Sequence, residues 1–107
     1  YDDPIITITE NGTAYDDPHV QDGQIRDSER TSFLHQHLAA VHSAIGEGVT
    51  VDGYFVGSLM DNFAWADGFT RRSGIVHVDF DTQIRTIKQS GRWYSRVIER
   101  NALVDPF

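Results

Sequence analysis

The 107-residue sequence has no cysteine, three prolines, one methionine and only nine lysine and arginine residues. Without cysteine the chain contains neither disulfides nor a thiolate metal site. No hydrophobic run approaches the roughly 18 residues that a membrane span needs. Sixteen acidic residues give a formal net charge of −7. This charge argues against nucleic acid and anionic membranes as partners, because both bind cationic surfaces.

The residues that are present nevertheless suit a folded protein. Hydrophobic residues make up 39% of the chain and aromatic residues 11%, which does not fit a disordered composition. The length suits one small domain or part of a larger one. The sequence starts at Tyr1 with neither an initiator methionine nor a signal-peptide pattern. We therefore expect a fragment, and a cytoplasmic rather than a secreted protein.

The first half of the sequence predicts two β-strands joined by a helix. Residues 5–9 form a β-branched apolar run that is typical of a buried strand and ends in a polar turn. Asp27 or Ser28 is expected to cap a helix that ends at Gly46. Residues 49–59 are predicted as the second strand. One face of the helix is apolar and consists of Leu34, Leu38, Val41 and Ile45.

The second half predicts a small hairpin followed by a helix. Apolar and polar residues alternate over residues 74–80, as in a half-buried strand, and residues 84–87 can return beside them. Ser90 is expected to cap the last helix, and Asn101 to end it. Trp93 lies on the apolar side of this helix and is therefore expected in the core.

The order of these elements indicates an incomplete sheet. A strand–helix–strand unit predicts two adjacent parallel strands. Parallel sheets in proteins are covered by helices on both faces or closed into barrels. Two strands and two helices are too few to form either arrangement. We therefore expect residues 1–107 to be a single segment of a larger α/β fold. Independent folding as a small domain is disfavoured, because its strand edges would be exposed.

Three segments, in order along the chain, resemble glycoside hydrolase family 1. The first is Ile-Thr-Glu-Asn-Gly at residues 8–12, which is similar to the family's nucleophile motif. The second covers residues 51–65 and resembles Gly-Tyr-Phe-x-Trp-Ser-Leu-x-Asp-Asn-Phe-Glu-Trp. The third, residues 74–80 with Trp93-Tyr94 downstream, looks like the family's C-terminal hairpin and final helix. The resemblance extends over essentially the whole chain.

This resemblance implies the last two βα units of a (β/α)₈ barrel, completed by another chain or segment that carries the N-terminal part. It also implies retaining hydrolysis of a β-glucoside, with Glu10 as the nucleophile and no cofactor or metal. Such chemistry needs two carboxyl groups about 5–5.5 Å apart. The family's acid/base glutamate lies in an Asn-Glu-Pro segment that this sequence lacks. The resemblance therefore implies that the acid/base residue lies on the missing part.

The sequence departs from the family pattern at three positions of one sugar subsite. Gly57 replaces a tryptophan, Ala64 replaces a glutamate that binds two sugar hydroxyls, and Ser73 replaces an aromatic residue. Trp65, a sugar contact in the family, is retained. Two hypotheses follow from these residues. One is a β-glucosidase-like enzyme with an impaired glycone subsite; the alternative is a degenerate or engineered scaffold that binds a small molecule and hydrolyses weakly.

Other polar residues are interpreted as structural or solvated. Asp61 and Asn62 belong to a polar turn at a strand end, where a structural role is the default. Arg71 and Arg72 form a short basic pair that we expect in solvent. The five histidines show no metal-ligand spacing, since His35 and His37 would point about 200° apart on a helix.

Overall fold

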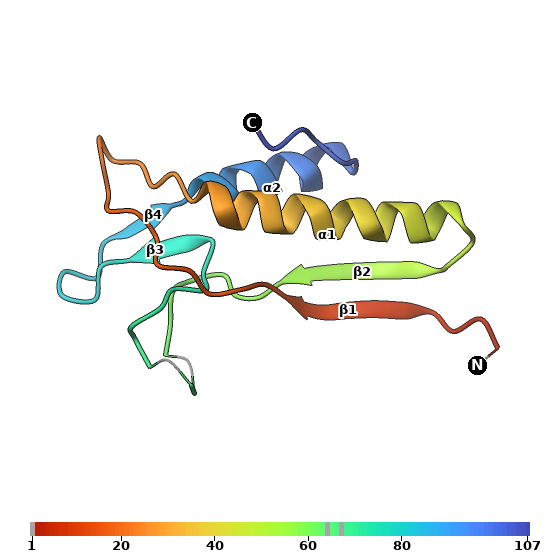
Figure 1. Ribbon diagram of the computed structural model, residues 1–107, viewed down its shortest axis with the longest axis horizontal. Helices are drawn as coiled ribbons and strands as arrows, with labels where there is room; N and C mark the ends of the chain where they lie inside the picture. The colour runs from red at the N-terminus through yellow and green to blue at the C-terminus, as the bar shows by residue number, and fades with distance from the viewer. Residues whose placement is uncertain (1, 64, 67) are drawn as a thin grey trace.

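The computed structural model describes residues 2–63, 65–66 and 68–107. Figure 1 shows the elements in the order strand, helix, strand, hairpin and helix, as predicted. No helix in these ranges is long and apolar enough to cross a membrane. The elements are β1 (Ile6–Asn11), α1 (Ser28–Gly46), β2 (Val51–Val56), β3 (Val76–Val78), β4 (Arg85–Ile87) and α2 (Gln89–Arg100).

Two small sheets organise the chain. β1 and β2 pair in parallel, with Ile6 opposite Val51 and Asn11 opposite Val56, and α1 forms the crossover between them. β3 and β4 form the predicted antiparallel hairpin. A single parallel bridge between Met60 and Val76 joins the segment after β2 to this hairpin. The hairpin therefore lies beyond the carboxyl end of β2.

The parallel sheet is open on one face and along its edges. In Figure 1 both helices lie on the same side of β1 and β2, and no described element covers the other side. The apolar run at the start of β1 was expected to be buried, but Ile5 is 69% exposed and Ile6 40% exposed. This expectation is wrong for the chain by itself, because within the described residues β1 and β2 each have only one strand neighbour.

The core lies between the helices and the hairpin. Leu34 from α1, Ile75 before β3 and Trp93 from α2 are buried against one another. The indole N–H of Trp93 donates a hydrogen bond to the Val104 carbonyl at 3.0 Å, which ties the C-terminal segment to α2. The prediction that Trp93 is a core residue is confirmed.

The start of α2 differs from the prediction. Lys88 is the N-cap residue, and Ser90 lies in the first turn. The Ser90 hydroxyl and backbone amide donate to the Asp27 carboxylate at 2.5 and 2.9 Å. Asp27, one of the two residues predicted to cap α1, is its N-cap residue, but its carboxylate accepts from Ser90 of α2 and from the Arg30 side chain and makes no capping hydrogen bond to α1. Asn101 ends α2 in the left-handed conformation, as expected.

Candidate active site

The carboxyl ends of β1 and β2 are held together around Asn11. The Gly57 amide donates to the Asn11 carbonyl at 3.0 Å, and the Tyr54 hydroxyl donates to Asn11 Oδ1 at 2.5 Å. A Cβ on Gly12 would lie 1.7 Å from the Gly57 carbonyl oxygen, so position 12 accommodates glycine alone. This close approach positions Glu10, the residue before Asn11, beside the end of β2.

Three of the predicted site residues line one cavity. Glu10, Gly57 and Ser73 surround a volume of about 460 Å³ beyond the strand ends. The Ser58 amide donates to the Ser73 carbonyl at 3.2 Å, which brings positions 57 and 73 together although they are far apart in sequence. Within the described residues, the Glu10 carboxylate has no hydrogen-bond or ion-pair partner. It is therefore accessible to a ligand in this cavity.

The other two predicted subsite residues do not complete this cavity. Trp65 is 98% exposed and does not line it, and Ala64 lies outside the described residues. Two residues that the sequence interpretation did not place there, Asn62 and Phe63, contribute to the lining. Phe63 also packs edge-on against Phe69, with ring centroids 5.4 Å apart. No periodicity in the sequence indicates this contact, because both residues lie in irregular loops.

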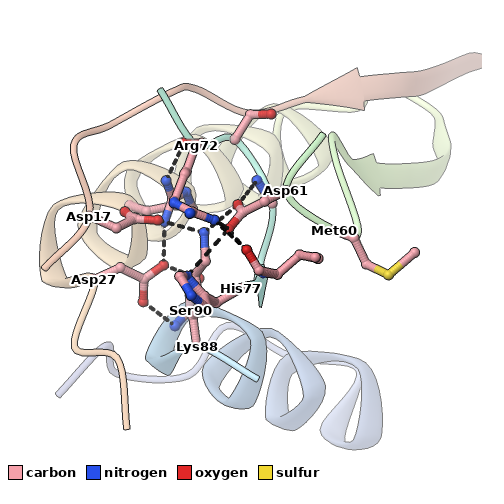
Figure 2. Close-up of polar contacts among 12 residues, drawn as sticks. Asp17, Asp27, Met60, Asp61, Arg72, His77, Lys88 and Ser90 are labelled. Atoms are coloured by element: carbon pink, nitrogen blue, oxygen red, sulfur yellow. Dashed lines mark hydrogen bonds and ion pairs between the residues drawn. The ribbon is translucent and has the colours of Figure 1, made fainter. Parts of the chain in front are cut away.

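A buried polar cluster joins the loops that flank the strand ends. Figure 2 shows that its side chains come from the loop after β1, the start of α1, the segment after β2 and the start of α2. Formally, three carboxylates balance three cations in this cluster. Its charged members are Asp17, Asp27, Arg30, Asp61, Arg72 and Lys88.

Asp61 is the carboxylate that accepts the most hydrogen bonds in this cluster. It accepts from Lys88 and Arg72, each at 2.7 Å, and from the backbone amides of Gly74 and Val78. Burial opposes its ionisation, but the hydrogen bonds from Lys88 and Arg72 outweigh burial and lower the pKa of Asp61 below its ordinary value. These contacts agree with the structural role predicted for the turn.

The expectation that Arg72 is solvated is wrong. Besides Asp61, its guanidinium donates to the Val78 carbonyl at 2.7 Å and lies 4.7 Å from the centroid of the Phe80 ring. The reason is tertiary, since the segment after β2 folds back onto the hairpin and brings Asp61 to Arg72. Arg71, in contrast, donates to the Ala14 carbonyl and is exposed.

The loop after β1 is anchored through Asp17. Its carboxylate accepts from Lys88 at 2.5 Å and from Arg30 at 2.8 Å. Arg30 also donates to Asp27 at 2.6 Å and to the Arg72 carbonyl at 2.6 Å. The loop that follows Glu10 is therefore fastened to both helices by charged hydrogen bonds in a buried setting.

His77 lies at the margin of this cluster. Its Nδ1 is buried, has no hydrogen-bond partner among the described residues and lies 3.5 Å from Asp61 Oδ2. Burial, and then the nearby Arg72 cation, lower the pKa of His77. Across the described part of the chain, no three His, Asp or Glu side chains gather as a metal site would require.

Comparisons with known proteins agree with this architecture. The model of the family described as glycosyl hydrolase family 1 matches residues 1–103. β-Glucosidase A of Thermotoga maritima is 50% identical over 105 residues, which cover 98% of this chain and 24% of that protein. A 6-phospho-β-galactosidase of Clostridium acetobutylicum is 44% identical over 100 residues, which cover 94% of this chain and 21% of that protein.

Solved structures show the same relationship in three dimensions. The family 1 β-glucosidase from Thermotoga maritima superimposes with a TM-score of 0.91 over 95% of this chain and 23% of that one. The same enzyme in complex with deoxynojirimycin gives a TM-score of 0.90. The chain thus spans about a quarter of the length of the relatives that it matches. The predicted fold class, part of a (β/α)₈ barrel, is confirmed.

Proposed function

Because the chain belongs to glycosyl hydrolase family 1, we propose that it supplies the nucleophile-bearing part of a retaining β-glycoside hydrolase. The position of Glu10 carries this proposal. Glu10 lies near the carboxyl end of β1 and lines the cavity beyond the strand ends. Catalytic residues of (β/α)₈ barrels gather at the carboxyl ends of the strands.

The proposed reaction proceeds in two steps. Glu10 Oε attacks the anomeric carbon and forms a glycosyl ester, while a second carboxylic acid protonates the departing oxygen. That second group, now a carboxylate, takes a proton from water as the water oxygen displaces Glu10. The second group lies about 5–5.5 Å from Glu10 in retaining enzymes. We assign it to the part of the barrel outside this chain.

The open sheet supports completion by further barrel strands. In the part of the chain that the structure describes, β1 and β2 each have one strand neighbour, and the apolar side chains of Ile5 and Phe55 are 69% and 58% exposed. A strand edge and an uncovered sheet face are unfavourable in a finished protein. We propose that the N-terminal part of the same barrel covers them, either within one polypeptide or as a second chain.

We propose a β-glucoside as the substrate, bound in a widened glycone subsite. The small residues at positions 57 and 73 line the cavity, and the resemblance also assigns Ala64 and Trp65 to this subsite. An aromatic wall contributes contact area and sugar stacking, and a bidentate charged hydrogen bond contributes roughly 1.5–3 kcal/mol. We therefore expect weak sugar binding and a low kcat/KM compared with an enzyme that keeps these groups.

A second candidate is a small-molecule binding module on the same scaffold. The observation that favours it is the cavity of about 460 Å³, a volume typical of ligand sites, which is lined by two positions, 57 and 73, where the family pattern has larger residues. In this alternative, Glu10 serves as an anionic contact for the ligand and hydrolysis is weak.

The nucleophile assignment is tested on the intact protein that carries this segment. Glu10→Gln should lower kcat for an aryl β-glucoside by at least about a thousandfold. The matched control is Glu47→Gln, which changes an exposed carboxylate at the far end of α1 and should leave kcat unchanged. A 2-deoxy-2-fluoro-β-glucoside should add one sugar mass to the peptide that contains Glu10. Labelling of another peptide would overturn the assignment.

Restoring the subsite separates the two candidates. A side chain at position 57 requires Glu10 to shift, as it would in relatives that have tryptophan there. With Glu10 shifted in this way, the triple variant Gly57→Trp, Ala64→Glu, Ser73→Phe should raise kcat/KM for the β-glucoside by orders of magnitude if the chain belongs to an impaired enzyme. A binding module would instead gain little activity and lose affinity for its own ligand. Native mass spectrometry of the same sample shows whether a second chain completes the barrel.

A further inference from the structure

A second cavity lies away from Glu10. It has a volume of about 430 Å³ and is formed by the segment before α1, the first half of α2 and the C-terminal residues. Among the residues that the structure describes, it shares no lining residue with the cavity that contains Glu10. Its apolar lining includes Ile25, which is buried, and Ile87 and Phe107, which are 50% and 74% exposed.

Free cationic side chains concentrate at this cavity. Of the nine cationic residues, three belong to the buried polar cluster and two donate to backbone carbonyls. Within the described residues, the other four have neither a hydrogen-bond nor an ion-pair partner: Arg26, Arg92, Arg96 and Arg100. All of these except Arg100 line the cavity. In a chain of net charge −7, this is a local excess of positive charge.

The placement of these arginines does not serve the stability of α2. Arg92 and Arg96 are four residues apart and share a helix face, where like charges repel. Arg92 also closes the first turn of α2, which has no acidic residue, and a cation is unfavourable near a helix N-terminus. The amides of Gln89 and Ser90 are engaged by Ile25 and Asp27. The guanidinium groups are therefore the free donors at this cavity.

We propose that this cavity binds a small organic phosphate, with the phosphate between the arginines and an apolar group against Ile87 and Phe107. Guanidinium groups bind phosphate through paired hydrogen bonds and keep their charge at all relevant pH values. The apolar lining adds a preference for a phosphate ester over inorganic phosphate, because burial of a ring removes apolar surface from water. This site is independent of the proposed glycosidase reaction.

The test is calorimetric titration of the intact protein with phenyl phosphate and with inorganic phosphate at low salt. Phenyl phosphate should bind more tightly than inorganic phosphate. Arg92→Gln and Arg96→Gln should each weaken phenyl phosphate binding about tenfold, which corresponds to one lost charged hydrogen bond. The matched control is Arg100→Gln, which removes the same charge from the same helix outside the cavity and should change affinity less than about twofold.

Two results would overturn the proposal. One is an equal loss of affinity in all three variants, which would indicate attraction by net charge alone. The other is absence of phenyl phosphate binding to the parent protein. Because the substituted side chains are exposed, the variants should keep the parent circular dichroism spectrum, and this is checked first. Failure of the Glu10 labelling experiment would leave this result unaffected, since the two cavities share no residue.

Discussion

The side chain of Glu10 occupies the space that a side chain at position 57 would take. A Cβ built on Gly57 would lie 2.3 Å from Glu10 Cγ and 3.0 Å from Glu10 Oε1. The Glu10 carboxyl group therefore takes this position only because residue 57 has no side chain. Any larger residue at position 57 requires the Glu10 side chain to move.

Gly57→Ala should displace Glu10 while leaving the fold intact, because the clashing atoms belong to a flexible side chain. We expect a crystal structure of the variant to show Glu10 in another rotamer, and the free energy of unfolding to fall by less than about 1 kcal/mol. Gly12→Ala provides the contrast, because its Cβ would meet a backbone carbonyl at 1.7 Å. It should lower the free energy of unfolding by about 3 kcal/mol. Similar losses in both variants would contradict this reasoning.

Asp61→Asn should destabilise the protein strongly. The substitution leaves the buried ammonium of Lys88 and the guanidinium of Arg72 with too little compensating charge. Breaking a buried ion pair in this way typically costs about 3–5 kcal/mol, and we expect a loss in this range by denaturant unfolding. The control Asp52→Asn changes an exposed carboxylate with one hydrogen bond from Thr7 and should cost less than about 1 kcal/mol. Equal effects would show that the cluster is not the stabilising feature.

His77 should make stability depend on pH just below neutrality. Its pKa in the folded protein lies below the ordinary value of 6.5, so the unfolded chain binds the proton more readily. The stabilising contribution of the neutral imidazole is complete above pH 6.5 and decreases as the pH falls toward the folded-state pKa. Urea unfolding at a series of pH values should show this decrease. His77→Gln should remove it, whereas His42→Gln on the exposed side of α1 should retain it.

Tyr54 should be a late-titrating phenol. Burial, and then the neighbouring Tyr94, raise its pKa to about 12 from an ordinary value of 10.0. The unfolded chain ionises first, so the stability contributed by the neutral phenol is lost as the pH rises above 10.0. Ultraviolet titration of the folded protein should show a step near pH 12 that Tyr54→Phe removes and Tyr15→Phe retains. Loss of this step in both variants would contradict the assignment to Tyr54.

Local patterns in the sequence predicted the elements well and their ends less well. The β-branched run before Glu10 and the apolar face from Leu34 correspond to β1 and α1. The cap of α2 was misplaced at Ser90, because the Ser90 hydroxyl binds Asp27 of the other helix. A serine near the start of a helix can cap that helix or bind a side chain of another element, and the sequence does not show which of the two its hydroxyl will bind.

The site was predicted only in part. The motif around Glu10 is the basis on which Glu10 is proposed as the nucleophile, and two of the three small residues assigned to one subsite, Gly57 and Ser73, line the same cavity as Glu10. The sequence did not predict that the Glu10 side chain lies over Gly57, nor that Arg72 is drawn into the buried polar cluster. Both depend on distances between segments that are far apart along the chain.

The sequence by itself determined the family and the order of strands and helices, because these follow from motifs and periodicity, and its motifs are also the source of the proposal that Glu10 is the nucleophile. Only the tertiary structure decided which side chains meet. It brought three carboxylates and three cations together in one buried cluster and left Arg26, Arg92 and Arg96 around a separate cavity, without a side-chain partner among the described residues. Such pairings are set by long-range packing, since a charge finds its partner in space rather than at a fixed spacing in sequence.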